Sequence, residues 1–168
     1  MEARLPQGGA MSITVIAVGR MKEKPYRQMA DEYLKRLSRF GKVEEIEIPD
    51  LPEPANTSAA IEQQIKEKEG AAILAKIRPD DAVIALCIDG RQLDSVQLSK
   101  KLTQIQDGGK RIVFVIGGSL GLSDAVVARA NVKLSFSPMT FPHQLARIML
   151  FEQVYRACKI AAGERYHK

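Results

Sequence analysis

Two short runs of the sequence, AVIALCID (residues 82–89) and RIVFVIGG (residues 111–118), are almost continuously apolar. A strand with one face in water alternates apolar and polar residues, whereas a continuous apolar run is typical of a strand covered on both faces. Such strands belong mainly to parallel sheets with helices on each side. These two runs constrain the fold most, because they require a layer on both faces of the sheet.

Strand and helix patterns alternate along the rest of the chain. The runs 12–20 and 132–136 predict further strands, and residues 42–50 alternate apolar residues with acids, which predicts a strand at a sheet edge. Helical periodicity and capping residues predict helices at about 24–40, 59–77, 94–107, 123–130 and 142–162. The predicted fold class is therefore α/β, a mainly parallel sheet of five to six strands with helices on both faces.

Length and composition predict one domain over residues 11–168. Residues 1–10 lack the apolar centre of a signal peptide and are expected to be a disordered extension. No apolar run reaches membrane-spanning length, so no membrane partner is expected. The only cysteines, Cys87 and Cys158, predict neither a disulfide framework nor a metal site. We interpret both as buried thiols in a reducing cytoplasm.

The net charge of +5 is unevenly distributed. Residues 20–42 hold eight basic and three acidic residues, residues 43–69 hold two and eight, and residues 142–168 hold five and two. Basic ends around an acidic middle suit a polyanion bound by one face, although ordinary solvated helix surfaces give the same pattern. Arg20, Lys22 and Lys24 are candidates for phosphate contacts, with an exposed basic turn as the alternative.

The glycine corner VIGGSLGL (residues 115–122) follows one predicted strand. Ligands of open parallel sheets bind beyond the carboxyl ends of the strands, where glycine lets a ligand approach the main chain. The corner lacks the lysine of a Walker P-loop and does not fit G-x-G-x-x-G. A tight turn without any ligand is the alternative interpretation.

The loop SFSPMTFPH (residues 135–143) strengthens the ligand interpretation. Its prolines stiffen the backbone, and its apolar side chains suit a flat heteroaromatic ring held by main-chain hydrogen bonds. The alternative is a rigid connector whose aromatic side chains join the core.

Three segments, FVIGGSLGLS, LSFSPMTFPHQLARIMLFEQVYRACKI and the terminal GERYHK, closely resemble the ribosomal RNA large subunit methyltransferase H family, of the SPOUT class. The resemblance covers nearly the whole chain from Met11. The chain departs from the family in its first ten residues and in GGSLG, where many members have Gly-Gly-Pro-Glu-Gly.

The resemblance implies an S-adenosyl-L-methionine-dependent enzyme, without a metal, that methylates pseudouridine at N3 in 23S rRNA of the ribosome. It also implies a C-terminal trefoil knot and a homodimer whose two chains form the site together. The implied cofactor contacts are Leu86, Gly117, Phe136, Ser137, Pro138, Met139, Thr140 and Phe141.

The chemistry needs a base for the N3 proton, and the chain has two histidines, His143 and His167. For His143, beside the loop, we favour a structural role. Tyr166 and His167 are the candidate catalytic or target-positioning residues. Arg165 and Lys168 beside them are candidates for phosphate contacts.

The last predicted helix carries two apolar stripes, Ile148, Phe151, Tyr155 and Cys158 on one side and Leu150, Val154, Ala157 and Ala161 on the other. Two stripes favour a dimer, with a helix buried in its own domain as the alternative. A non-catalytic ribosome- or RNA-binding factor that keeps the methyltransferase fold is the alternative function, and a flavodoxin-like phosphate binder is a third.

Overall fold

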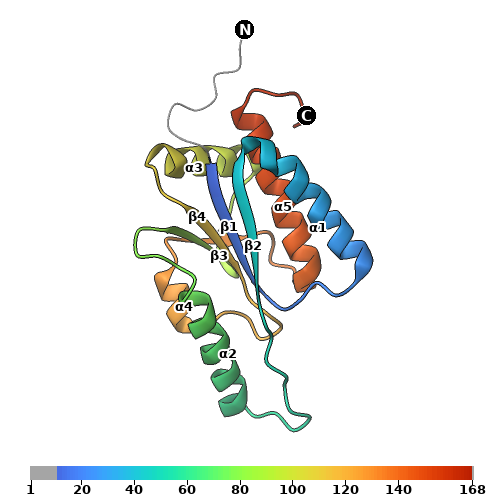
Figure 1. Cartoon of the computed structure of the whole chain (residues 1–168). Helices are drawn as coiled ribbons and strands as arrows, with labels where there is room; N and C mark the ends of the chain where they lie inside the picture. Colours follow the sequence, from blue (N-terminus) through green and yellow to red (C-terminus); the bar gives the residue numbers. More distant parts are fainter. Residues whose placement is uncertain (1–10, 168) are drawn as a thin grey trace.

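A computed structural model describes residues 11–167 of the chain (Figure 1). The predicted extension 1–10 and Lys168 lie outside the described residues. The strands are β1 (Met11–Val18), β2 (Gly41–Ile48), β3 (Ala82–Gln92), β4 (Ile112–Ile116) and β5 (Val132–Ser135). The helices are α1 (Lys24–Leu37), a 3-10 turn (Ser38–Phe40), α2 (Ala59–Leu74), α3 (Ser95–Asp107), α4 (Asp124–Arg129) and α5 (His143–Ala161).

The strands form one sheet of five, all parallel, in the order β2-β1-β4-β3-β5. The α/β prediction is confirmed, and so is the edge position of the strand that alternates apolar residues with acids, β2. The helix that capping residues predict at 94–107 is also present. Asp94 and Gln97 form a reciprocal capping box at the start of α3.

A separate core fills each face of the sheet. Alternate side chains of β1 and β4 point to opposite sides, as the period of a strand requires. Ile13, Val15 and Phe114 join a core with α1, α3 and α5. Ile16 and Val113 join a second core with α2 and α4. The two layers explain why the central strands carry almost no polar residues.

Strand β3 differs from its prediction. The apolar run ends at Asp89, but the strand runs on to Gln92 with a register shift on β5 between Leu86 and Arg91. A Cβ on Gly90 would lie 2.8 Å from main-chain carbons of Lys133 and Leu134. Gly90 therefore lets β3 come back close to β5, where Arg91 and Gln92 pair with it again. It does not end the strand.

The stripes of α5 do not provide the free surface expected from the sequence. Seven of the eight stripe residues are buried within their own chain, where α5 packs against α1, α3 and the sheet, and only Ala161 is exposed. The alternative, a helix buried in its own domain, is what the structure shows. Among residues 11–167, no helix combines the length and apolar character needed to cross a membrane.

Candidate functional site at the carboxyl ends of three strands

A cavity of about 650 Å³ lies beyond the ends of β4 and β5 and beside the part of β3 that shifts its register on β5. Its walls come from residues 86–89, the corner 116–122 and the loop 134–143, together with Ala146 of α5. The corner and the loop are the two segments for which the sequence predicted a ligand. Seven of the eight implied cofactor contacts line the cavity, namely Leu86, Gly117, Phe136, Ser137, Met139, Thr140 and Phe141. Pro138 belongs to the same loop but is not among the lining residues.

The glycine corner is shaped by close packing rather than by unusual dihedral angles at its first two glycines. Only Gly121 in this corner has a positive φ, of 83°. A Cβ on Gly117 would lie 2.9 Å from the carbonyl carbon of Gly121 and 3.1 Å from the Leu122 side chain. The positive φ therefore requires glycine at Gly121. At Gly117, the lack of a side chain allows the corner to fold back on itself and present its backbone to the cavity.

The loop after β5 is held by hydrogen bonds of its own serines. The Ser135 hydroxyl donates to the Ser137 carbonyl at 3.1 Å, and the Met139 amide donates to the Ser137 hydroxyl at 2.9 Å. The amides of Thr140 and Phe141 make no hydrogen bond within residues 11–167 and are available to a ligand. Met139 is 72% exposed. The loop thus offers fixed main-chain donors beside an apolar surface.

His143 connects the cavity to the turn after β1. Its ring lines the cavity, and its Nε2 lies 3.4 Å from where a Cβ of Gly19 would stand. Arg20, Lys22 and Lys24, which follow Gly19, are all exposed and form no ion pair among the described residues. The predicted phosphate contacts of this turn therefore lie beside the predicted cofactor site.

A buried guanidinium fixes that turn. Arg147 is 0% exposed and donates to Glu47 at 2.6 Å, to Glu45 at 3.2 Å and to the carbonyl of Gly19 at 2.9 Å. Burial alone would raise the pKa of Glu47, but hydrogen bonds from Arg147 and from the Met21 amide outweigh it and lower that pKa. The sequence analysis missed this cluster, because its members are far apart in the chain.

The C-terminal tail lies at the other end of α5 (Figure 1). The Tyr166 ring packs 5.1 Å from that of Tyr155, and its hydroxyl lies 3.3 Å from Glu152. Arg156 stacks over Tyr166 and approaches His167 Nδ1 at 3.3 Å. Within one chain the structure therefore does not bring Tyr166 and His167 to the cavity. The neighbouring Arg165 is exposed.

The contacts of the tail affect the pKa of Tyr166 and the hydrogen bonding of His167. Burial, followed by the Glu152 carboxylate, raises the pKa of the Tyr166 phenol, so this group stays protonated at neutral pH. An arginine can only donate hydrogen bonds, so in this contact His167 Nδ1 is the acceptor and its lone pair is engaged by Arg156. His167 must therefore leave Arg156 before this nitrogen can act on a ligand.

The cysteines differ from each other. Cys158 is buried, and burial raises its pKa to about 12, which keeps the thiol protonated and unreactive. Cys87, expected to be buried as well, is only half-buried and lines the cavity. The difference arises because Cys87 lies where β3 leaves its register with β5.

Comparisons with known proteins show the family of the chain. The family model described as predicted SPOUT methyltransferase matches residues 11–167. The chain belongs to the SPOUT methyltransferase family. It is 52% identical over 159 residues to the ribosomal RNA large subunit methyltransferase H of Shouchella clausii, covering 94% of this chain and all of that protein. A protein of the same name, numbered 1, from Clostridium perfringens is 55% identical over the same coverage. The resemblance drawn from the three sequence segments is confirmed.

A solved structure shows the same fold at much lower identity. A methylase family protein of Neisseria gonorrhoeae superposes with a TM-score of 0.52 and 15% identity, covering 86% of this chain and 82% of that one. This likeness concerns the fold alone. The C-terminal knot that the family implies stays a prediction.

Proposed function

We propose that this SPOUT methyltransferase transfers the methyl group of S-adenosyl-L-methionine to N3 of a pseudouridine in 23S rRNA of the ribosome, in the cytoplasm. The observation that carries the proposal is the single cavity built from three strand ends, seven of whose lining residues match the family's cofactor contacts. The names and high identity of the relatives support the ribosomal RNA substrate.

The cavity fits the cofactor in size and in chemistry. Its volume of about 650 Å³ lies within the range of roughly 300–1,000 Å³ found for small-molecule sites. Unpaired amides at Thr140 and Phe141 suit the acceptor atoms of an adenine ring, and Leu86 and Met139 suit its faces. When bound, the cofactor supplies an electrophilic methyl group on sulfur. The residues of the chain hold it and align the nucleobase, since methyl transfer of this kind depends mainly on positioning.

The enzyme that we propose is a homodimer in which the tail of one chain completes the cavity of the other. The tail rests on Glu152, Tyr155 and Arg156, about 1.7 to 2.8 turns along α5 from Ala146 in the cavity wall. Apolar side chains exposed around the site, such as Ile88 (59%) and Met139 (72%), also suit a partner surface. The dimer therefore rests on these features, and not on the buried stripes of α5.

In the completed site, Tyr166 and His167 act on the nucleobase. Tyr166, protonated at neutral pH, stacks on the ring or donates a hydrogen bond to it. His167, once released from Arg156, takes up the N3 proton as the methyl group is transferred. Arg20, Lys22, Lys24, Arg165 and Lys168 contact the phosphates around the target.

Mass spectrometry of 23S rRNA tests the function. RNA from cells without this protein should lack one N3-methylpseudouridine, and ribosomes from those cells should regain it when incubated with the purified protein and S-adenosyl-L-methionine. The variant lacking residues 166–168 is the matched control and should bind the cofactor without restoring the mark. An unchanged modification pattern in the deleted cells would contradict the proposal.

A further inference from the structure

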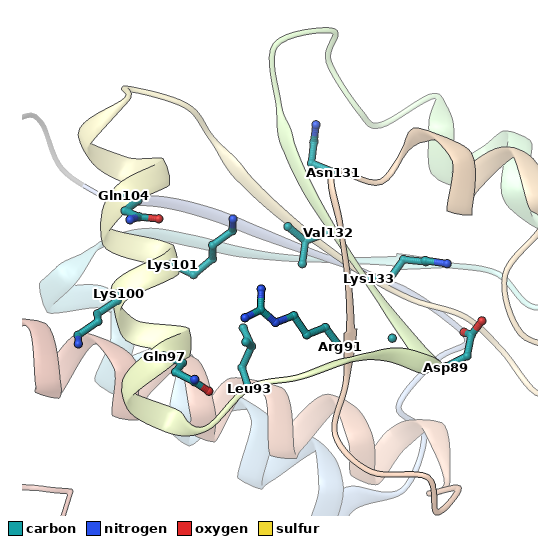
Figure 2. A pocket seen from close by; sticks show the side chains of 11 residues that line it. Asp89, Arg91, Leu93, Gln97, Lys100, Lys101, Gln104, Asn131, Val132 and Lys133 are labelled. Atoms are coloured by element: carbon teal, nitrogen blue, oxygen red, sulfur yellow. The ribbon is translucent and has the colours of Figure 1, made fainter.

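A second hollow, of about 590 Å³, lies between α3 and the edge strand β5 (Figure 2). Asp89 lines both the first cavity and this hollow. The segment 87–90 of β3, which is out of register with β5, forms a wall of each. We call the second hollow the α3–β5 groove. None of its residues was a candidate site residue in the sequence analysis.

The α3–β5 groove is basic. Arg91 extends from β3 toward α3, and Lys101 extends from α3 toward the strands, so that both cations point into the same space (Figure 2). Lys100 stands at its outer margin, whereas Lys133 points away from α3. Over residues 11–167, neither Arg91 nor Lys101 belongs to an ion pair. Two cations that extend into the same space and have no ion-pair partner among residues 11–167 favour an anionic ligand, although Asp89 also lines the groove.

One face of α3 adds neutral hydrogen-bond donors to these cations. Gln97, Lys101 and Gln104 recur at the i, i+4 and i+7 positions that share one face of α3. The side-chain oxygen of Gln97 accepts from the Asp94 amide at 2.9 Å in the capping box, which leaves its NH₂ group free to donate. The face therefore combines cations with amide donors, the mixture that contacts phosphate and sugar in nucleic-acid complexes.

The scaffold of the groove is rigid. The Ser99 hydroxyl donates to the Ala157 carbonyl at 2.7 Å, and the Ser95 hydroxyl donates to Gln153 at the same distance, so α3 is fixed on α5. On the other side, the close approach at Gly90 holds Arg91 against β5. The two cations are thus presented from fixed elements rather than from a loop.

We infer that the α3–β5 groove binds the sugar–phosphate backbone of the RNA substrate through Arg91 and Lys101, an inference that rests on the proposed function. An RNA strand fits better than a small anion, because the groove adjoins the first cavity at Asp89. A strand that leaves the nucleobase site can pass the wall at 87–90 and enter the groove. Contacts of this kind carry no base specificity and set the register of the RNA.

The test compares wild-type protein with the double variant Arg91→Gln/Lys101→Gln. Lys68→Gln/Lys76→Gln is the control for loss of two charges, because both lysines are exposed and neither has an ion pair among the described residues. Cofactor affinity is measured by calorimetry, and methyl transfer to ribosomes lacking the mark is measured at several KCl concentrations. The double variant should retain cofactor affinity and kcat, while KM for ribosomes rises about tenfold and the salt dependence of log KM falls by about two.

The outcomes separate the groove from the proposed function. If the wild-type protein is active and the double variant has the KM and salt dependence of Lys68→Gln/Lys76→Gln, the proposed role of the groove is overturned. Saturable ATP binding that the double variant loses would identify a small-nucleotide site and would overturn it as well. Absence of methyl transfer by the wild-type protein would instead overturn the proposed function.

Discussion

The position of the tail leads to a quantitative prediction for mixed dimers. Tyr166 is held on Tyr155, and positions 146 and 155 of α5 are separated by about 14 Å at a rise of about 1.5 Å per residue. A tail that serves the cavity of the other chain makes each site from two chains. Two variants with different defects should then restore each other in a mixed dimer.

The first variant is Gly117→Val, and the second lacks residues 166–168. The atoms nearest to a Cβ at Gly117 belong to Gly121 and Leu122, in the corner after β4, so the distortion should stay in the cavity wall and leave the sheet intact. Each variant alone should be inactive. After random exchange of equal amounts, about half of the dimers are mixed and each has one complete site, so activity should reach about one quarter of wild type.

The assay measures labelled methyl groups transferred to ribosomes that lack the mark. Mixed dimers are isolated through a different affinity tag on each chain, and calorimetry confirms that the tail deletion keeps cofactor affinity while Gly117→Val loses it. If Gly117→Val unfolds, Thr140→Trp takes its place, because Thr140 is an exposed residue of the cavity wall. Background activity of folded, purified mixed dimers would refute the shared site and place the tail in its own chain.

Three further predictions concern stability, measured by urea unfolding. Arg147→Met should cost about 1–3 kcal/mol, because it removes the buried donor of Glu45 and Glu47, although Arg27 stays 2.6 Å from Glu45; an unchanged free energy of unfolding would show that the cluster is replaceable. Burial raises the pKa of Glu69, so its contribution is present below the unfolded pKa and lost as pH rises through the folded one. The free energy of unfolding of Glu69→Gln should therefore increase relative to that of the wild type as pH rises. A difference between the two that does not change with pH would contradict this. Gly90→Ala should cost about 1–3 kcal/mol by forcing β3 from β5, unlike Gly109→Ala, where a Cβ meets no atom within 4 Å and only the positive φ is strained.

Periodicity predicted the sheet, its wetter edge and the helix layers, because these depend on local patterns of burial. The strand ends that form the cavity were also predictable, since glycine and proline mark where ladders stop. Periodicity could not show that Arg147 joins Glu45 and Glu47, which lie about a hundred positions away. Periodicity also predicted a dimer surface on α5 that the chain itself covers. Two apolar stripes have the same sequence pattern whether α1 and α3 or another chain cover them.

Residues that act together across the fold were missed for a similar reason. Arg91 and Lys101 belong to different elements, and their charges are unremarkable in a sequence that is basic overall. Their shared direction becomes visible only once β3 shifts its register on β5. The same shift explains why Cys87 reaches the cavity instead of the core.

The strand order divides labour across the sheet. Strands β4, β3 and β5 line the cavity, while β1 and β2 carry the cationic turn and its carboxylate anchors. The two parts adjoin directly, because β1 pairs with β4, and the first turns of α5 connect them again through His143 and Arg147. A substitution at His143 or Arg147 is therefore expected to disturb the cavity wall and the cationic turn together.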